Sequence, residues 1–348
     1  MNKCKRLLAG LMTAVLLFSV TACSGDTTWV MKTEDDTLPA GVYIAYLMDA
    51  YTEAQDKIDS TKDTWEQTIE DVSAEQWIVN RAVERSKQYI AVNIMYDELG
   101  MALDTEADKV IKNQANTAWE QGQETYEKNG IAFSSVQKLA ENNYKAEKLF
   151  NHFYEVDGVE AVSEETIQEY FYDNYAKIRL MSFSKVDMNT GETKDLDALN
   201  EQIDAYITRI NKGEDIDTII DGYVAQTWKD YGLTEEYSPD TSDDSRNITL
   251  VNKNDTTSVR AGIIAKTFEQ TEYGVPYTDD TSSSFIYLAV RYDLAKDTTG
   301  LYEDNRAAVL YQLRGDEFES KLTEYASGVT VELNQESINR YSPKNLKQ

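Results

Sequence analysis

The sequence predicts a mostly α-helical protein with an α+β domain inserted in the middle of the chain. Apolar side chains recur at helical spacing through almost all of residues 42–176. Two apolar runs typical of strands follow at residues 178–183 and 284–290, with helical segments between them. The chain then becomes helical again over residues 301–326, so helical segments flank the α+β region on both sides.

Three patterns led by serine predict where helices of the first region begin. Ser73, followed three residues later by Gln76, forms a capping-box pattern, and the long helix that it starts is expected to end before Gly100. Ser134 and Ser163 are predicted to cap two further helices. A serine at such a position accepts a hydrogen bond from a backbone N–H group that the helix itself cannot pair.

The two ends of the chain are predicted to meet in a small sheet. Residues 29–32 have the composition of a short strand, residues 38–41 of a turn, and residues 328–333 of a second strand. Because an isolated strand leaves its backbone groups unpaired, these two strands are natural partners. The polar and acidic residues 234–258 predict a long surface loop.

The predicted organisation has five parts, and about 325 residues remain for one or two domains after the first part is removed. The parts are a signal peptide at residues 1–22, a tether and entry strand at 23–41, a helical domain at 42–176, an α+β domain at 177–297, and a C-terminal helix and strand at 298–348 that return to the helical domain.

The first 23 residues predict export and lipid anchoring. Lys3, Lys5 and Arg6 precede an uncharged apolar run at residues 7–20, which is shorter than the roughly 20 residues of a membrane span. The run ends in the sequence VTAC at Cys23, which is similar to a bacterial lipobox, where the cysteine thiol becomes the carrier of the lipid. We therefore expect cleavage before Cys23 and lipidation of its thiol. The alternative is an ordinary secretory signal that ends near a cysteine by chance.

Composition limits the partners that the protein can have. The chain has two cysteines, and because Cys4 would leave with the signal peptide, no disulfide is expected. The formal net charge of −28 becomes −31 when the three basic residues of the predicted signal are removed. Such a charge repels nucleic acid, so no nucleic-acid partner is expected. The predicted membrane contact is the lipid anchor.

The sequence gives little support to catalysis or cofactor binding. His152 is the only histidine, and a structural role near a helix end is favoured over a catalytic one. Zinc sites need several histidines or cysteines, so no metal site is predicted. The run from Asp187 to Gly191 resembles the start of a calcium loop but lacks later ligands, which favours a hairpin turn. No cofactor is expected, while a hydrolase built on paired carboxylates stays open among 62 acidic residues.

The layout resembles the SurA- and PrsA-like extracytoplasmic foldases. The resemblance is carried by the opening residues 38–43, the helix at 165–175 leading into Lys177, the turn at 211–216, and the tail around Phe318. It implies that the N-terminal helices and the C-terminal helix form one client-binding chaperone module, like the N-terminal module of SurA. It also implies that the inserted domain has a parvulin-type fold.

The inserted domain departs from that family where catalysis would occur. Active parvulins carry a histidine on the first strand and another on the last. Here Leu180 stands in the first of these positions, and residues 284–290 contain no histidine. The glycine pair typical of the active family is also missing from residues 231–258. The resemblance therefore implies a degenerate parvulin domain without an assigned catalytic residue.

Together these observations favour a membrane-anchored extracytoplasmic chaperone that binds unfolded, newly exported polypeptides. Tyrosine-rich and apolar helical surfaces give the adaptable contacts that promiscuous binding requires. Two alternatives remain at this stage. One is an active peptidyl-prolyl isomerase with unusual residues, and the other is a surface lipoprotein with one specific partner.

Overall fold

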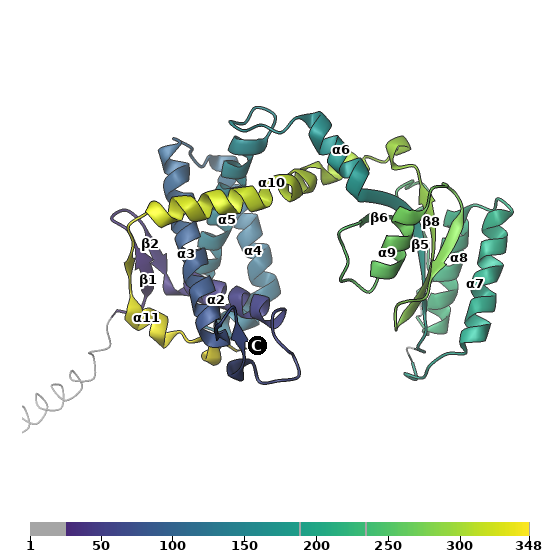
Figure 1. The fold of residues 1–348 in the computed structure, drawn as a ribbon, viewed down its shortest axis with the longest axis horizontal. Helices are drawn as coiled ribbons and strands as arrows, with labels where there is room; N and C mark the ends of the chain where they lie inside the picture. The colour runs from purple at the N-terminus through teal and green to yellow at the C-terminus, as the bar shows by residue number, and fades with distance from the viewer. Residues whose placement is uncertain (1–25, 188, 234, 348) are drawn as a thin grey trace, which may run out of the picture. The chain divides into compact units, whose positions relative to one another are not determined.

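The computed structural model describes residues 26–187, 189–233 and 235–347, which form two compact units (Figure 1). Unit 1 combines the described residues up to Ala161 with the segment from Gly315, and unit 2 spans Val162–Arg314. The protein is mostly helical, with a four-stranded antiparallel sheet in the middle of the chain. The predicted signal peptide and Cys23 lie outside the described residues.

Unit 1 contains the long helices of the first half of the chain together with the C-terminal tail. Its elements are β1 (Trp29–Lys32), β2 (Thr37–Pro39), α2 (Ala40–Gln55), η1 (Thr64–Glu66), β3 (Thr68–Ile69), β4 (Val72–Ser73), α3 (Ala74–Glu98), α4 (Thr105–Lys128), α5 (Phe133–Tyr154), the C-terminal part of α10 (Leu301–Gly328), β9 (Glu332–Leu333), α11 (Gln335–Arg340) and η3 (Pro343–Asn345).

Two of the three predicted helix caps are confirmed. The Ser73 hydroxyl accepts a hydrogen bond from the Gln76 backbone N–H at 3.2 Å, and Ser163 caps the helix that follows it in the same way. The predicted cap at Ser134 is wrong, because α5 already begins at Phe133, behind Ala132, without a side-chain cap. Ser134 therefore lies inside the first turn, where its hydroxyl cannot replace the missing cap.

The two ends of the chain meet as predicted. Strand β1 is the central strand of a three-stranded sheet in the order β2-β1-β9, with Met31 opposite Leu333 and Lys32 opposite Glu332. The C-terminal strand is shorter than predicted, since α10 continues to Gly328 and only two residues pair. The predicted turn at residues 38–41 is wrong. The chain reverses earlier, where the Thr33 N–H donates to the Asp36 carbonyl, and β2 then leads directly into α2.

The core of unit 1 lies between α2 and α3 and is closed by the small sheet. Small side chains on both helices, among them Ala50 and Ala82, let the helix axes approach, and larger side chains such as Leu47 and Ile90 fill the space between them. Each fully buried leucine or isoleucine stabilises the fold by roughly 1.5–3 kcal/mol. Ile338 of α11 belongs to the same buried cluster, so the C-terminal tail is part of this core.

Unit 2 is an α+β arrangement around one antiparallel sheet with the strand order β6-β5-β8-β7. Its elements are α6 (Glu164–Asn174), β5 (Tyr175–Ser184), α7 (Leu196–Asn211), α8 (Ile216–Asp230), β6 (Ile248–Asn252), α9 (Ala261–Glu269), β7 (Pro276–Asp279), β8 (Phe285–Tyr292), η2 (Leu294–Lys296) and the first part of α10.

The two faces of this sheet are covered by different helices. On β5, Met181 and Phe183 pack against α7 and α8, whereas Ile178 and Leu180 point to the opposite face, which α9 covers. This alternation follows from the two-residue period of a strand. Both predicted central strands are therefore confirmed, and both sheet faces are buried.

The predicted loop at residues 234–258 is wrong in part, because β6 lies inside it and pairs with β5. This strand is short and lies at the sheet edge, and its apolar residues Ile248, Leu250 and Val251 are set within a long polar and acidic stretch. Strand β7 at the opposite edge was not predicted at all. Edge strands are commonly short and polar, which removes the pattern that marks a buried strand.

The cap assignments predict a difference between two serines. Replacing Ser73 by alanine should reduce the free energy of unfolding of unit 1 by about 1 kcal/mol, because the Gln76 N–H loses its acceptor. The matched change Ser134→Ala should have an effect close to zero, since Ser134 is exposed and does not cap α5. Urea unfolding followed by circular dichroism measures both. Equal losses for the two variants would contradict the assignment.

Candidate functional site

One hollow of unit 1 lies between α3, the C-terminal turns of α10, and the β9–α11 segment. We call it the α3 groove. Its volume is about 390 Å³. Val79 and Val83 of α3 line it one helical turn apart, opposite Ala326, Leu333 and Ile338. The groove therefore has an apolar floor formed by α3 and the C-terminal segment of the chain.

The α3 groove continues into a wider, open hollow of about 610 Å³ whose lining is mostly acidic. The two hollows share Glu84, Thr323 and Ser327. The rim of the second hollow carries four carboxylates and one guanidinium. These are the side chains of Glu84, Asp316, Glu319, Glu324 and Arg81. The excess of carboxylates gives the rim a negative potential that favours basic ligands.

The guanidinium at this rim is already engaged by the protein. Arg81 donates to Glu53 at 2.9 Å and to Glu84 at 3.0 Å, and Arg85 donates to the same Glu53 oxygen at 2.9 Å. Burial acts to raise the pKa of Glu53, but the hydrogen bonds and charges of Arg81 and Arg85 outweigh it and hold that pKa below its ordinary value. These ion pairs fix α3 against α2 and leave the negative charge of the rim dominant.

A separate hollow of about 450 Å³ lies between α2, α4 and α5. Tyr46, Met48, Tyr126 and Leu139 contribute most of its larger apolar surfaces. Burial raises the pKa of Tyr46 far above its ordinary value, so its hydroxyl stays neutral at physiological pH. Methionine and tyrosine adapt to differently shaped partners, so this hollow can accept apolar side chains of varied form.

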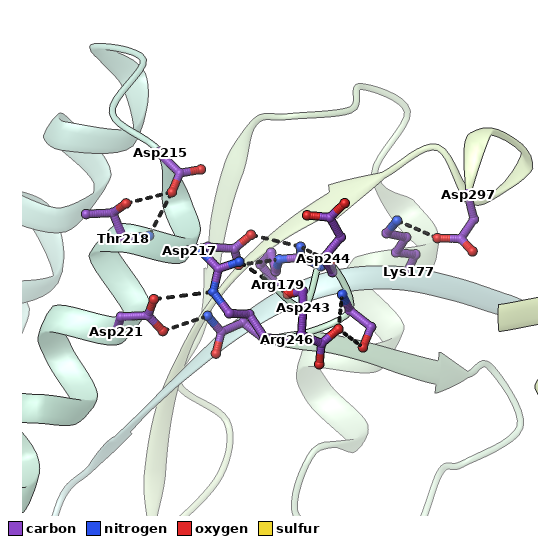
Figure 2. A network of polar contacts seen from close by, with 12 residues as sticks. Lys177, Arg179, Asp215, Asp217, Thr218, Asp221, Asp243, Asp244, Arg246 and Asp297 are labelled. Carbon is purple, nitrogen blue, oxygen red and sulfur yellow. Dashed lines mark hydrogen bonds and ion pairs between the residues drawn. The ribbon is translucent and has the colours of Figure 1, made fainter. Parts of the chain in front are cut away.

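Unit 2 contains a polar network at the start of α8, shown in Figure 2. Arg179 of β5 is only 8% exposed and donates to both carboxylate oxygens of Asp217, at 2.6 and 2.9 Å. Next to it, Asp221 accepts from Arg246 at 3.5 Å and from Asn247 at 3.0 Å. The charges of this network neutralise one another, as a buried arginine requires. The Arg179–Asp217 pair joins α8 to strand β5 of the sheet. The contacts of Asp221 join α8 to residues 246 and 247, which precede β6.

The residues singled out from the sequence do not come together in a catalytic site. Leu180 packs toward α9, β8 has no histidine, and His152 lies on α5 in unit 1, against the Phe153 ring. In the described part of the chain, no group of three potential metal-ligating side chains could hold an ion. The predicted turn after Asp187 is present, with Asp187 accepting hydrogen bonds from the Asn189 and Thr190 amides.

Sequence reasoning missed the Arg179–Asp217 pair and the α3 groove. An arginine inside an apolar strand is a usable signal, because a buried guanidinium needs a carboxylate partner, but the sequence does not show which of many acids supplies it. The groove gives no local signal, since its floor joins residues 79–83 to residues 326–338.

Comparison with known proteins gives a distant structural likeness. No protein-family model matches the chain, and no curated protein matches it. Among solved structures, foldase protein PrsA from Streptococcus pneumoniae is 13% identical with a TM-score of 0.37, covering 82% of this chain and 98% of that one. Foldase protein PrsA from Lactococcus lactis is 10% identical with a TM-score of 0.37, covering 90% and 99%. PrsA from Bacillus subtilis is 12% identical with a TM-score of 0.30, covering 87% and 93%.

None of the helices in the described part of the chain could serve as a transmembrane span.

A buried ion pair fastens the end of unit 2 where α10 begins. The Lys177 ammonium lies 2.6 Å from Asp297, which also accepts from the Thr299 and Leu301 amides (Figure 2). Burial acts to raise the pKa of Asp297, but the hydrogen bonds from Lys177, Leu301 and Thr299 outweigh it and lower that pKa to about 2. The carboxylate thus serves both as an ion-pair partner and as a cap for the first amides of α10.

The lowered pKa predicts an acid-sensitive unit 2. Because the folded pKa lies below the unfolded one, the stabilisation is complete above about pH 4 and is lost as the pH falls toward 2. Asp297→Asn should reduce the free energy of unfolding at pH 7 by about 2 kcal/mol and flatten its decline between pH 4 and 2. The control Glu214→Gln, at an exposed ion pair, should change little. Unfolding curves across this pH range that coincide for Asp297→Asn and the unaltered protein would contradict the assignment.

Proposed function

We propose that this protein is a membrane-anchored extracytoplasmic chaperone that binds unfolded segments of newly exported polypeptides without catalysing prolyl isomerisation. The observation that supports it most is the α3 groove, which joins an apolar floor to an acidic rim in one open surface. An open groove of this kind contacts a few side chains of an extended segment at a time. Binding is then weak and tolerant of sequence, as a holding chaperone requires.

The charge of the protein sets its client preference. A chain of net charge −28 stays soluble while it holds an aggregation-prone client. The carboxylates of the rim, including Glu319 and Glu324, favour clients with basic residues next to apolar ones. Because these carboxylates face solvent, their contribution should weaken as salt rises.

Unit 2 acts in this proposal as a degenerate parvulin-like scaffold. The absence of histidine from residues 162–314 and the use of Arg179 and Asp217 in a closed ion pair support this assignment. Both carboxylate oxygens of Asp217 are engaged by Arg179 and the guanidinium is buried, so neither side chain is open to a prolyl amide. Client binding is therefore assigned to unit 1.

Anchoring is assigned to Cys23. A single acyl chain holds a protein to a bilayer only marginally, so the two or three chains of a bacterial lipoprotein lipid would be needed for stable attachment. The protein would then work at the outer face of the cytoplasmic membrane, where exported chains emerge unfolded.

If clients bind in the α3 groove, a more polar floor should weaken chaperone activity. The double change Val79→Thr and Val83→Thr keeps side-chain size but adds hydroxyl groups, and it should weaken suppression of client aggregation several-fold. Val110→Thr on α4, also partly buried but outside the groove, is the matched control and should keep the activity. Light scattering of several unfolded clients at equimolar ratio measures the effect.

Four results would contradict this proposal. The first is an unaltered protein that fails to slow the aggregation of several clients, and the second is a floor variant that matches the control. A clear rate gain in a prolyl isomerisation assay at high protein concentration would overturn the non-catalytic assignment. A stoichiometric complex with one client and none with the others would favour a single-partner lipoprotein instead.

The proposed lipidation of Cys23 predicts that replacing Cys23 or Cys4 affects membrane association differently. Cys23→Ser should move the protein from the membrane fraction to the soluble fraction or the medium, because the thiol that would carry the lipid is gone. Cys4→Ser should leave it in the membrane fraction, since Cys4 lies in the predicted signal peptide. Cell fractionation and immunoblotting measure both. Membrane retention of Cys23→Ser would overturn the anchor.

A further inference from the structure

The first residues of unit 1 are clamped by the C-terminal tail. The Asn334 amide donates to the Asp26 carbonyl at 2.6 Å, the Arg340 guanidinium donates to the Thr27 hydroxyl at 2.8 Å, and the Tyr341 hydroxyl donates to the Thr27 carbonyl at 3.0 Å. Thr27 is buried by these contacts. The chain is therefore fixed to α11 from its fourth residue after Cys23.

This clamp leaves little chain between the proposed lipid and the folded body. The span from Cys23 to Thr27 is four residues, which reach at most about 14 Å when fully extended. A lipid on Cys23 sits in the bilayer, so α11 and the start of β1 would lie within that distance of the membrane surface. Figure 1 draws α11 beside β1, in agreement with the contacts of the clamp.

The segment that clamps Thr27 has an excess of basic residues, which favours contact with the anionic lipids of a bacterial membrane. Residues 334–347 carry three basic side chains, Arg340, Lys344 and Lys347, and one acidic side chain, Glu336; Lys344 also pairs with Glu75 of α3 at 2.6 Å, which leaves a smaller excess of positive charge. This local excess of positive charge contrasts with the net charge of −28 for the whole chain. Basic residues close to an anionic lipid surface are attracted to its head groups over about a Debye length.

We propose that the tail end of unit 1, formed by α11 and residues 341–347, is a membrane-facing surface that lies against anionic lipid head groups. The proposal rests on the lipidation of Cys23 proposed above. The short tether and the Thr27 clamp hold this end toward the bilayer, and the basic tail contacts the head groups. Because Gln335 and Ile338 of α11 also line the α3 groove, one end of the groove would open next to the membrane.

The opposite end of unit 1 provides an internal reference. Asn129, just before α5, exchanges hydrogen bonds with the Lys347 backbone, so the start of α5 lies beside the tail. Helix α5 has 22 residues and is therefore about 33 Å long. Asp157, exposed just beyond its other end, should lie far from the membrane, whereas Asn339 on the exposed face of α11 should lie near it.

Fluorescence quenching tests the proposal on the full-length lipidated protein in vesicles of phosphatidylcholine and phosphatidylglycerol. Asn339→Cys or Asp157→Cys supplies the labelling thiol, because lipidation would occupy Cys23. Lipids with a nitroxide on the head group should quench a fluorophore at position 339 at least several-fold more than one at 157. The double change Arg340→Gln and Tyr341→Phe removes clamp contacts and should reduce this difference, whereas the exposed control Lys112→Gln on α4 should preserve it.

The possible results distinguish a failure of the membrane-facing surface from a failure of the lipid anchor at Cys23. Equal quenching at positions 339 and 157 in protein shown by mass spectrometry to carry lipid would overturn the membrane-facing surface alone. Protein that carries no lipid on Cys23 would overturn the anchor and this inference together. Quenching at 339 that is unchanged by the clamp variant would overturn the role of the Thr27 contacts.

Discussion

The hydrogen bonds that join β1 to β9, and Thr27 to α11, are the constraint on which unit 1 depends. They bring residues 26–39 and 332–347 into one small sheet with its flanking helix, although roughly 300 residues separate them in the chain. The buried Ile338 then completes the core between α2 and α3. The α3 groove is a direct consequence, because one wall comes from α3 and the others from α10, β9 and α11.

This closure also explains how an α+β unit can be inserted without interrupting the helical core. The insertion leaves unit 1 after α5 and returns through α10, whose two parts belong to different units. Each unit has its own buried clusters, so each core forms from its own residues. Unit 2 is fastened by polar contacts at defined points, namely Arg179 with Asp217 and Lys177 with Asp297. These contacts use charged side chains of its sheet for stability.

Features with a strong local cause were predictable from the sequence. The caps at Ser73 and Ser163, the strands around Ile178 and Phe285, and the pairing of the chain ends each follow from a short pattern or from the need to pair backbone groups. Features set by distant contacts were not. Strand β6 pairs with an open edge of β5, and its five residues are hidden in the sequence by the polar and acidic stretch around them.

The α3 groove could not be predicted from the sequence, because it too is formed by contacts between distant segments. The floor residues Val79 and Leu333 are ordinary apolar positions in their own segments, and only the fold places them in one hollow. The one histidine of the sequence, His152, lies on α5 in unit 1, outside the inserted domain, as its position in the sequence indicates. The predicted lipid anchor at Cys23 stays a proposal, since it lies outside the described residues.

The central claim is that α3 and the C-terminal segment of α10, β9 and α11 together form the surface that holds a client, and site-specific photo-crosslinking tests it most directly. A photoreactive amino acid at Leu333, 40% exposed and in the α3 groove, is compared with one at Leu99, 42% exposed and outside the groove at the end of α3. With an unfolded basic client present, this account predicts strong adducts from position 333 and weak ones from position 99. Equal yields at the two positions, or a higher yield at 99, would contradict it.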